Sequence, residues 1–265
     1  MQLQFEAQSM EQHATDSSKR LFALEGQVGI VTGASRGIGY AIAQVLRDAG
    51  AVVYDLSRHV VADHDGTNGI YGISCDVSDE EQFARVLQQI VQSHGKLNFL
   101  VNNAGVSYKE RAENFPLEQY RRIAKVDLEA PFRLCQLCYP YLKQSCGAVV
   151  NITSMGAYMG FSGVAPYCAM KSGLSGLTRA LAEEWSAEGI RVNSVSPGWV
   201  ETEMNHHMFE QNPQRRQQAL AKSMTGKFVH PEDIGCAVQF LLSAAARSIT
   251  GQDISVDGGA RSHGY

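Results

Sequence analysis

Short apolar runs, many of them rich in β-branched residues, alternate with longer amphipathic segments along most of the chain. Such runs predict strands, here over residues 28–32, 51–56, 70–75, 98–102, 148–153, 190–195 and 253–256. The longer periodic segments predict helices over 38–49, 79–93, 117–143, 165–188 and 232–243. Several runs lack polar alternation, which is typical of strands that are buried on both faces. The repeated strand–helix–strand order therefore predicts an α/β fold, with a parallel sheet that helices cover on both faces.

Three segments depart from that alternation. Residues 59–74 (HVVADHDGTNGIYGIS) contain no clear amphipathic helix, so the connection predicted there is a loop or a single turn. Residues 203–222 are polar with scattered Met and Phe, and they predict a mobile helical flap rather than core. Residues 1–25 are mostly polar and predict a flexible N-terminal extension, without the apolar stretch of a signal peptide. No break in composition follows, so residues 26–265 are predicted to form one domain.

Composition narrows the possible partners and the compartment. The net charge is −4 and no run of Lys and Arg forms a basic stripe, so nucleic acid and anionic membranes are not expected partners. Residues 144–170 carry no charge, but glycines and a proline interrupt them, so they do not form the run of about 20 apolar residues that a membrane span needs. The six cysteines form no disulfide framework, which favours the reducing cytoplasm. Cys135 and Cys138 form a C-x-x-C within a predicted helix and are interpreted as buried thiols.

A glycine-rich turn follows the first predicted strand. Glycines stand at positions 33, 37 and 39 of the sequence TGASRGIG, between a strand and the helix that follows it. Glycines at such a junction allow a tight turn and a close approach of backbone N–H groups to a pyrophosphate at the helix N-terminus. A purely structural turn could use the same glycines, but the position between strand and helix favours a dinucleotide site.

Tyr167 and Lys171 stand one helical turn apart in YCAMK and so share one face of a predicted helix. A free phenol has a pKa of about 10, and a neighbouring ammonium lowers the pKa of a phenol toward the working range of an acid–base catalyst. An ordinary packed Tyr–Lys pair is the alternative. Ser154, which follows a predicted buried strand, favours the catalytic interpretation.

The combination of TGASRGIG (32–39), NNAG (102–105), Ser154 with YCAMK (167–171) and PGWVET (197–202) resembles the short-chain dehydrogenase/reductase family. The resemblance extends from about Gly26 to Gly259. It implies a single-domain Rossmann fold with a doubly wound, seven-stranded parallel sheet. It also implies an NAD(P)(H)-dependent oxidoreductase that transfers a hydride between a nicotinamide cofactor and a carbonyl or secondary alcohol. Within the family, the chain is most similar to NADP(H)-preferring members such as 3-oxoacyl-[acyl-carrier-protein] reductases and carbonyl or sugar reductases.

The resemblance implies four catalytic positions and no metal. Ser154 and Tyr167 would hydrogen-bond the substrate oxygen, Tyr167 would exchange the proton, and Lys171 would hold the nicotinamide ribose. The fourth position is Asp127, where the family has asparagine. That asparagine's backbone carbonyl helps to hold a water that relays protons to the lysine. Asp127 keeps a backbone carbonyl but adds a negative charge near Lys171.

The resemblance also implies the cofactor contacts. They would come from the turn (Gly33, Ser35, Arg36, Gly37, Ile38 and Gly39), from Ser57, Arg58, Asp76 and Val77, from Asn103, Ala104 and Gly105, from Tyr167 and Lys171, and from Pro197, Gly198, Val200 and Thr202. Arginines at positions 36 and 58 could pair with a ribose 2′-phosphate, so NADP is the expected cofactor. NAD is the alternative if the strand register shifts by two and Asp55 hydrogen-bonds the ribose 2′-OH.

Substrate and assembly are less constrained by the sequence. Candidate pocket residues are mostly large and apolar: Met155, Tyr108, Trp199, Met204, Met208 and Phe161, each of which could instead be core. Arg215, Arg216 and Lys222 in the flap could bind an anionic group. The resemblance implies a homotetramer, with a dimer as second choice, through the helices near 117–143 and 165–188. One alternative to a carbonyl reductase is an NAD-dependent sugar or polyol dehydrogenase. Another is a non-catalytic NADP-binding regulatory or scaffold protein, for which Asp127 is the only support.

Overall fold

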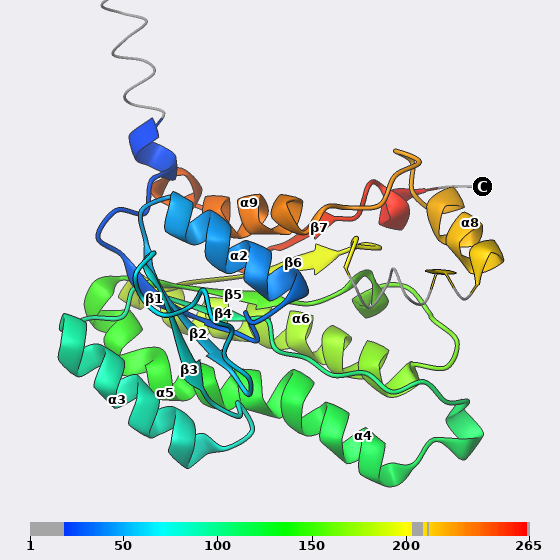
Figure 1. The fold of residues 1–265 in the computed structure, drawn as a ribbon, viewed down its shortest axis with the longest axis horizontal. Helices are drawn as coiled ribbons and strands as arrows, with labels where there is room; N and C mark the ends of the chain where they lie inside the picture. Colours follow the sequence, from blue (N-terminus) through cyan, green and yellow to red (C-terminus); the bar gives the residue numbers. More distant parts are fainter. Residues whose placement is uncertain (1–18, 203–208, 211, 264–265) are drawn as a thin grey trace, which may run out of the picture.

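A single parallel sheet forms the centre of the protein (Figure 1). The computed structural model describes residues 19–202, 209–210 and 212–263. The seven strands are β1 (Val28–Thr32), β2 (Val52–Ser57), β3 (Ile70–Ser74), β4 (Phe99–Asn102), β5 (Ala148–Ile152), β6 (Arg191–Pro197) and β7 (Asp253–Val256). Their order in the sheet is β3-β2-β1-β4-β5-β6-β7, and every neighbouring pair is parallel. The predicted α/β fold with a doubly wound sheet is confirmed.

Helices cover both faces of the sheet, as Figure 1 shows. The first face carries α2 (Gly37–Asp48) and α9 (Pro231–Leu242); the second carries α3 (Glu80–His94), α4 (Leu117–Ala124), α5 (Ala130–Ser145) and α6 (Ala165–Trp185). An apolar cluster fills each interface between sheet and helices. All five residues of β1 and of β5 are buried, which explains why these strands lack polar alternation.

The strand order reverses at β1, which lies between β2 and β4. In an open parallel sheet, ligands bind in the crevice at the carboxyl ends of the strands where the order reverses. The glycine turn leaves the carboxyl end of β1 and the NNAG segment leaves that of β4, so the fold brings these two motifs together.

The connection between β2 and β3 is a loop rather than a helix. An isolated antiparallel bridge joins Asp65 of this loop to Tyr71 of β3. The loop lies directly on β3, because a Cβ atom at Gly72 would overlap the Val60 side chain and lie 3.1 Å from the His64 Cβ. The prediction of a short connection without an amphipathic helix is confirmed.

The long helix predicted over 117–143 is interrupted in the structure. The residues between α4 and α5, Lys125–Glu129, form a π-helical turn. π-turns are rare and often occur at functional sites. Here the turn directs the side chain of Asp127 into the protein, where it is fully buried. The prediction of one continuous helix was therefore incomplete at this point.

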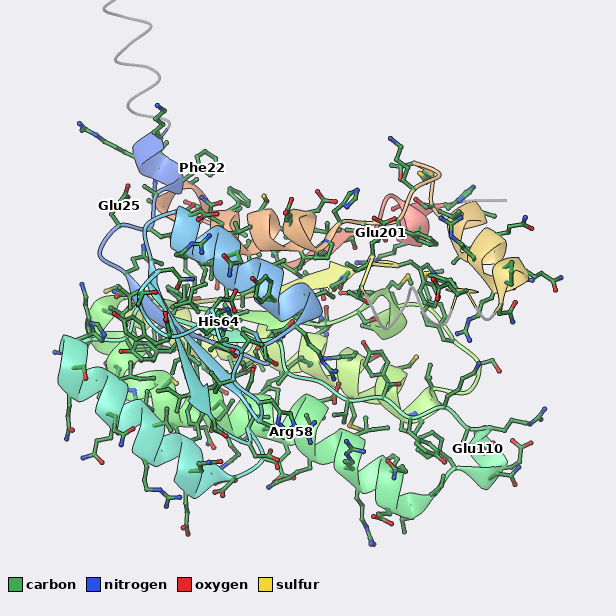
Figure 2. The ribbon with its side chains drawn as sticks, viewed as in Figure 1. Phe22, Glu25, Arg58, His64, Glu110 and Glu201 are labelled. Carbon is green, nitrogen blue, oxygen red and sulfur yellow. The ribbon has the colours of Figure 1, made fainter. Side chains whose placement is uncertain are left out.

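Residues before the predicted domain boundary already pack on the domain. Leu24 is fully buried, the Phe22 ring lies 6.1 Å from that of Phe240, and the Gln239 side chain donates a hydrogen bond to the Phe22 carbonyl. Figure 2 shows Phe22 beside the end of α9. Residues 1–18 of the predicted extension lie outside the described residues.

Two further predictions concern the flap and the cysteines. Part of the predicted helical flap is helical, as α8 (Pro213–Ala221), while residues 203–208 and 211 lie outside the described residues. Cys135 and Cys138 are fully buried, as predicted, and burial raises the pKa of the Cys135 thiol to about 12. A thiol with so high a pKa is almost entirely protonated at neutral pH and is a poor nucleophile.

No helix in the described part of the chain is long and apolar enough to cross a membrane.

Candidate active site

The glycine turn between β1 and α2 has the shape of a phosphate cradle. Gly33 and Gly37 have φ angles of +67° and +58°, in the left-handed region that favours glycine. A Cβ atom at Gly39 would overlap the Gly33 carbonyl oxygen, so the helix can approach the strand this closely only with glycine there. In the described part of the chain, the side chain of the N-cap residue Arg36 forms no capping hydrogen bond with the first turn of α2. The turn thus fits the pyrophosphate of a dinucleotide, with helix N–H groups directed at the anion.

The NNAG segment holds this turn in place from the neighbouring strand. The Asn103 side-chain amide donates hydrogen bonds to the carbonyl oxygens of Thr32 and Gly33, at 2.9 and 3.1 Å. The backbone N–H groups of Asn103 and Ala104 both donate to the Thr32 hydroxyl, at 3.0 Å. Asn102 points the other way and donates to the Asn151 side chain at 2.8 Å, which ties β4 to β5. The two asparagines therefore serve different parts of the sheet.

Asp55 lies under the glycine turn and is fully buried. Its Oδ1 accepts hydrogen bonds from the Ala34 N–H at 2.9 Å and from the Ser57 hydroxyl at 2.5 Å, while its Oδ2 lies 2.8 Å from His64 Nδ1. The Ser57 oxygen in turn accepts from the Ser35 N–H at 3.2 Å. The hydroxyl proton of Ser57 is thus used within the protein to support the turn.

This arrangement corrects one alternative from the sequence. The strand ends at Ser57 and Asp55 is an internal residue of β2, aligned with Val31 on one side and Gly72 on the other. The register shift that would place Asp55 at the end of the strand is wrong. Both of its carboxylate oxygens are occupied by protein groups, so Asp55 does not present a free carboxylate to a ribose.

Two exposed arginines lie near the glycine turn, one just before α2 and one just after β2. Arg36 precedes α2, and Arg58, which is labelled in Figure 2, follows β2. Burial alone would raise the pKa of Asp76, but the hydrogen bonds from Ser78 and the charges of Arg58 and Arg122 lower it overall. Arg58 therefore lies close to the end of β3, near Asp76, another predicted cofactor contact.

Asp76 itself organises a turn rather than a helix cap. Its Oδ1 accepts from the Ser78 N–H at 2.9 Å and from the Ser78 hydroxyl at 2.7 Å. The N-cap of α3 is Asp79, whose side chain accepts from the Gln82 N–H at 2.9 Å. Neither Asp76 nor Ser78 is therefore the cap of this helix. Val77 between them is buried.

Ser154 and Tyr167 face one small space beyond the end of β5. Ser154 is the N-cap of the short helix Met155–Ala157, and its hydroxyl accepts a hydrogen bond from the Gly156 N–H at 3.0 Å. A Cβ atom at Gly156 would lie 3.3 Å from the Ser154 hydroxyl and 3.6 Å from the edge of the Tyr167 ring. The two side chains, thirteen residues apart in the chain, therefore converge.

Lys171 is buried beneath Tyr167. Its Nζ lies 5.7 Å from the centre of the Tyr167 ring, within the range of a cation–π contact. The ammonium donates a hydrogen bond to the Ile152 carbonyl at 3.0 Å and lies 3.3 Å from Asp127 Oδ2. The side chains of Lys171 and Asp127 are 5% and 0% exposed, so this ion pair is shielded from water.

The second oxygen of Asp127 is fixed by the backbone. Its Oδ1 accepts from the Val106 N–H at 2.8 Å, just after the NNAG segment. A Cβ atom at Gly105 would lie 2.9 Å from Asp127 Oδ2 and 3.5 Å from Lys171 Nζ. Gly105 therefore makes room for the ion pair, and the carboxylate joins three elements: the end of β4, the π-turn and α6.

A second carboxylate, which the sequence analysis missed, supports the region around Ser154. Asp253 at the start of β7 accepts a hydrogen bond from Ser175 at 2.9 Å, lies 3.2 Å from the Thr153 hydroxyl and also accepts from Ser196. These hydroxyls come from α6, β6 and the residue before Ser154. The available signal was an aspartate at the first position of the short predicted strand DISV.

The segment after β6 returns to the glycine turn. A Cβ atom at Gly37 would lie 3.6 Å from the Thr202 methyl group, so Thr202 lies beside the cradle. Val200 is buried and forms an isolated bridge with Val229. A Cβ atom at Gly198 would lie 2.6 Å from the Asp257 Cα, which explains the glycine after Pro197. Of the cofactor contacts predicted in this segment, Thr202 is thus brought to the glycine turn.

An aromatic wall continues from this segment. The ring of Trp199 lies 6.0 Å from Phe161 and 5.6 Å from Phe209, and Phe209 stacks on Phe228 at 4.9 Å. Two of the predicted pocket residues, Phe161 and Trp199, are therefore brought together. Met155 is buried, whereas Tyr108 is 38% exposed and packs on a different ring. Met204 and Met208 lie outside the described residues.

Comparison with known proteins agrees with this geometry. A family model described as enoyl-(acyl carrier protein) reductase matches residues 33–261. The 3-oxoacyl-[acyl-carrier-protein] reductase of Vibrio cholerae is 36% identical over 242 residues, which cover 89% of this chain and 98% of the relative. The D-threitol dehydrogenase of Mycolicibacterium smegmatis is 36% identical over 247 residues, which cover 90% and 94%. The structure of Pseudomonas aeruginosa RhlG with NADP aligns with a TM-score of 0.84 and 31% identity, over 91% of this chain and 99% of RhlG.

The chain is a short-chain dehydrogenase/reductase. As a short-chain dehydrogenase/reductase it is an NAD(P)(H)-dependent oxidoreductase, which transfers a hydride between a nicotinamide cofactor and a carbonyl or secondary alcohol. The similarity covers both the glycine turn and the YCAMK helix, so it includes both halves of the crevice.

Proposed function

We propose that this short-chain dehydrogenase/reductase interconverts a ketone and a secondary alcohol with NADP(H), using Ser154, Tyr167 and Lys171 as catalytic residues. The observation that carries the proposal is the convergence of these three side chains at the carboxyl end of β5, on the side of the crevice opposite the glycine turn. A bound nicotinamide dinucleotide would supply or accept the hydride. The protein supplies position, a proton and stabilisation of the oxygen that becomes charged.

Each residue has a separate part in this chemistry. The Ser154 hydroxyl donates to the substrate oxygen and stabilises the developing alkoxide. The Tyr167 phenol delivers the proton to that oxygen, or accepts it when an alcohol is oxidised. Lys171 places a positive charge below the phenol ring, which favours the phenolate that forms when the proton leaves. Lys171 would also contact the nicotinamide ribose.

A substrate panel tests this function directly. Ketones and aldehydes of several classes, including β-ketoacyl thioesters, sugars and cyclic ketones, are each mixed with the protein and NADPH, and the loss of NADPH absorbance is followed. We expect turnover with at least one class. Binding of NADPH without turnover of any class, in either direction, would favour the non-catalytic alternative.

Asp127 has a role in this mechanism that differs from that of the family's asparagine. Its carboxylate holds the Lys171 ammonium directly, at 3.3 Å, while its backbone carbonyl remains within the π-turn. We infer that a proton relay through the backbone carbonyl is retained, because a carboxylate and an amide at this position have nearly the same shape.

Replacing Asp127 with asparagine is therefore expected to keep or raise kcat. The amide can still accept from the Val106 N–H through its oxygen, and the negative charge next to Lys171 is removed. Steady-state kinetics over a range of pH compare the two proteins, with the Kd for NADPH as a control. A large loss of kcat with unchanged cofactor binding would show that the carboxylate itself takes part in the reaction.

The preference for NADP is supported by the charges around the end of β2. Arg36 is exposed at the end of the glycine turn and Arg58 is exposed just after β2, whereas Asp55 is buried with both oxygens bonded. A planar guanidinium is well suited to a ribose 2′-phosphate. The RhlG structure with NADP gives independent support. An NAD-dependent sugar or polyol dehydrogenase is not favoured, because it relied on Asp55 as the ribose ligand.

Arg58→Ala is expected to raise the Kd for NADPH by about tenfold to a hundredfold, because hydrogen bonds to charged groups contribute about 1.5–3 kcal/mol each. The Kd for NADH should change little, since NADH has no 2′-phosphate. Fluorescence titrations of both cofactors with both proteins give the two ratios. Arg247→Ala, at an exposed arginine far from the turn in the chain, serves as the matched control. Equal loss of both cofactors would contradict a role for Arg58 in phosphate selection.

The substrate side of the crevice supports a partly apolar substrate. Trp199 and Phe161 form an aromatic surface next to the nicotinamide side, and Arg215 lies 5.9 Å from the Trp199 ring. We propose a substrate with hydrocarbon surface beside its carbonyl group. An anionic group at its far end could meet Arg215 or Arg216 of α8; Lys222 is exposed just after that helix.

We also propose a homotetramer in the cytoplasm, with a dimer as the second choice. Large apolar side chains are exposed on α4 and α5, where Leu117, Tyr120 and Phe132 are 59%, 42% and 37% exposed. The described cysteines are free thiols, which is consistent with a reducing compartment. Light scattering of the purified protein gives the assembly state.

A further inference from the structure

Asp253, the first residue of β7, accepts hydrogen bonds from hydroxyl groups of three separate elements. β7 is the last strand of the sheet and lies beside β6 (Figure 1). Asp253 Oδ2 accepts from the Ser175 hydroxyl at 2.9 Å and lies 3.2 Å from the Thr153 hydroxyl. Asp253 Oδ1 accepts from the Ser196 hydroxyl. All three hydroxyl-bearing residues are buried, so these contacts are shielded from water.

Two of these hydroxyls stand directly before predicted site residues. Thr153 precedes Ser154, the predicted donor to the substrate oxygen. Ser196 precedes Pro197, where the run of predicted cofactor contacts at residues 197–202 begins; we call this run the cofactor segment. One carboxylate at the edge of the sheet therefore joins the residue before the catalytic serine to the residue before the cofactor segment.

The third hydroxyl links the same carboxylate to α6. Ser175 stands one helical turn after Lys171, so both side chains lie on one face of the helix. The Lys171 ammonium donates to the Ile152 carbonyl of β5, and the Ser175 hydroxyl donates to Asp253 of β7. Successive turns of α6 are thus fixed to strands on either side of β6.

Asp253 also sets the direction of the hydroxyl protons around it, because a carboxylate accepts hydrogen bonds and donates none. Since Ser196 donates its proton to Asp253, the Ser196 oxygen can accept from the Thr153 hydroxyl at 2.8 Å. The Thr153 hydroxyl also has the Val195 carbonyl at 3.0 Å, and the Thr153 N–H donates to that carbonyl at 2.8 Å. Backbone and side chain together therefore hold Thr153, and with it the start of Ser154, against β6.

The far end of the segment that carries Ser154 contacts the same carboxylate. Burial raises the pKa of the Tyr158 phenol, and so does a hydrogen bond to Asp253. The Arg261 guanidinium lies 3.4 Å from the centre of the Tyr158 ring, so the C-terminal part of the chain packs on this residue. Ser154 thus lies between two residues, Thr153 and Tyr158, that both contact Asp253.

We propose that Asp253 is a positioning residue of the reaction: it fixes the Ser154 hydroxyl relative to the cofactor segment. The proposal rests on the proposed function, in that Ser154 donates to the substrate oxygen. The Ser154 hydroxyl accepts from the Gly156 N–H, so its own proton is available for that donation. Asp253 need not touch substrate or cofactor, since it acts through Thr153 and Ser196. A displacement of about 1 Å at a reacting group can lower the rate about a hundredfold.

The test is a double-mutant cycle between Asp253→Ala and Ser154→Ala in the full-length protein. Asp253→Ala alone is expected to lower kcat about tenfold and to change the Kd for NADPH less than about twofold, because it displaces Ser154 and leaves the glycine turn intact. In the Ser154→Ala background, Asp253→Ala is expected to change kcat less than about twofold, because the group that it positions is already absent. Steady-state kinetics with the best substrate of the panel and fluorescence titrations with NADPH give both quantities.

Three single variants support the cycle. Asp253→Asn keeps one acceptor oxygen and is expected to retain most of the kcat that the alanine variant loses. Thr153→Val removes only the hydroxyl before Ser154; it is expected to lower kcat as Asp253→Ala does, and it takes the place of that variant if thermal unfolding shows that the latter does not fold. Asp65→Ala is the matched control, because Asp65 also accepts from a hydroxyl, that of Thr67 at 2.6 Å, but in the loop between β2 and β3. Its kcat should equal that of the wild type.

The outcomes separate this inference from the function on which it rests. If the wild-type protein turns over no substrate of the panel, the proposed function fails and the role of Asp253 fails with it. If the wild type is active and Asp253→Ala lowers kcat by the same factor with and without the Ser154 hydroxyl, the role of Asp253 fails while the function stands. Wild-type kcat in Asp253→Ala would overturn it equally, as would a loss of NADPH binding as large as the loss of kcat.

Discussion

Replacing Tyr167 with phenylalanine is expected to lower kcat by about a thousandfold, in the middle of the range for loss of a general acid or base. The ring remains and keeps its position 5.7 Å above the Lys171 ammonium, so only the proton-bearing oxygen is lost. The Kd for NADPH should stay close to the wild-type value, because the phenol oxygen is only one of the many predicted cofactor contacts. Steady-state kinetics with the best substrate of the panel and a fluorescence titration with NADPH give the two quantities.

Two variants show whether the loss belongs to the phenol. Cys168→Ser changes the adjacent helical position, which also faces Gly156, and should leave kcat unchanged. Ser154→Ala removes a donor to the substrate oxygen and should lower kcat by about a hundredfold. Full turnover by the phenylalanine variant would mean that another group delivers the proton. A loss of NADPH binding as large as the loss of kcat would mean that Tyr167 mainly holds the cofactor.

The fold was predictable because its determinants are local. Several strands, such as β1, are apolar runs without alternation, helices such as α2 have an apolar stripe, and glycines mark the turn at β1. The loop that replaces a helix between β2 and β3 was predictable for the same reason, since residues 58–69 lack the 3.6-residue period of a helix. The π-turn at Lys125–Glu129 was not, because one extra residue in a helix leaves the apolar period nearly intact.

The residues of the site were predictable, and so was a negative charge near Lys171 at position 127, but the direct contacts of the buried charges were not. Ser154, Tyr167 and Lys171 follow from a motif, whereas the ion pair of Lys171 with Asp127 depends on how α6 packs against the π-turn. The pairing of Asp55 with His64 likewise joins a strand to a loop nine residues later in the chain. The one local signal was a charged residue inside the apolar run AVVYDL, which marks a carboxylate that needs buried donors. A periodic pattern shows that a residue is buried, but only the tertiary structure shows which donors it meets.

Replacing Lys171 with methionine is expected to abolish measurable turnover and to lower the free energy of unfolding by about 3–5 kcal/mol. The first effect arises because the positive charge beneath Tyr167 is lost. The loss of stability arises because the fully buried Asp127 no longer has the Lys171 ammonium at 3.3 Å. Its carboxylate is then left as an unpaired buried charge, or it must take up a proton. Chemical denaturation followed by circular dichroism gives the free energy, and stopped assays with NADPH give the residual rate.

The double variant Lys171→Met with Asp127→Asn separates these two effects. An asparagine at position 127 is neutral and can still accept from the Val106 N–H, so most of the lost stability should return. The rate should not return, because the neutral pair still lacks the cation that favours the phenolate. If the double variant is as unstable as the single one, the cost of Lys171→Met comes from packing around the methionine and not from an unpaired carboxylate. If the double variant regains turnover, the cation is dispensable and Tyr167 acts as an acid without it.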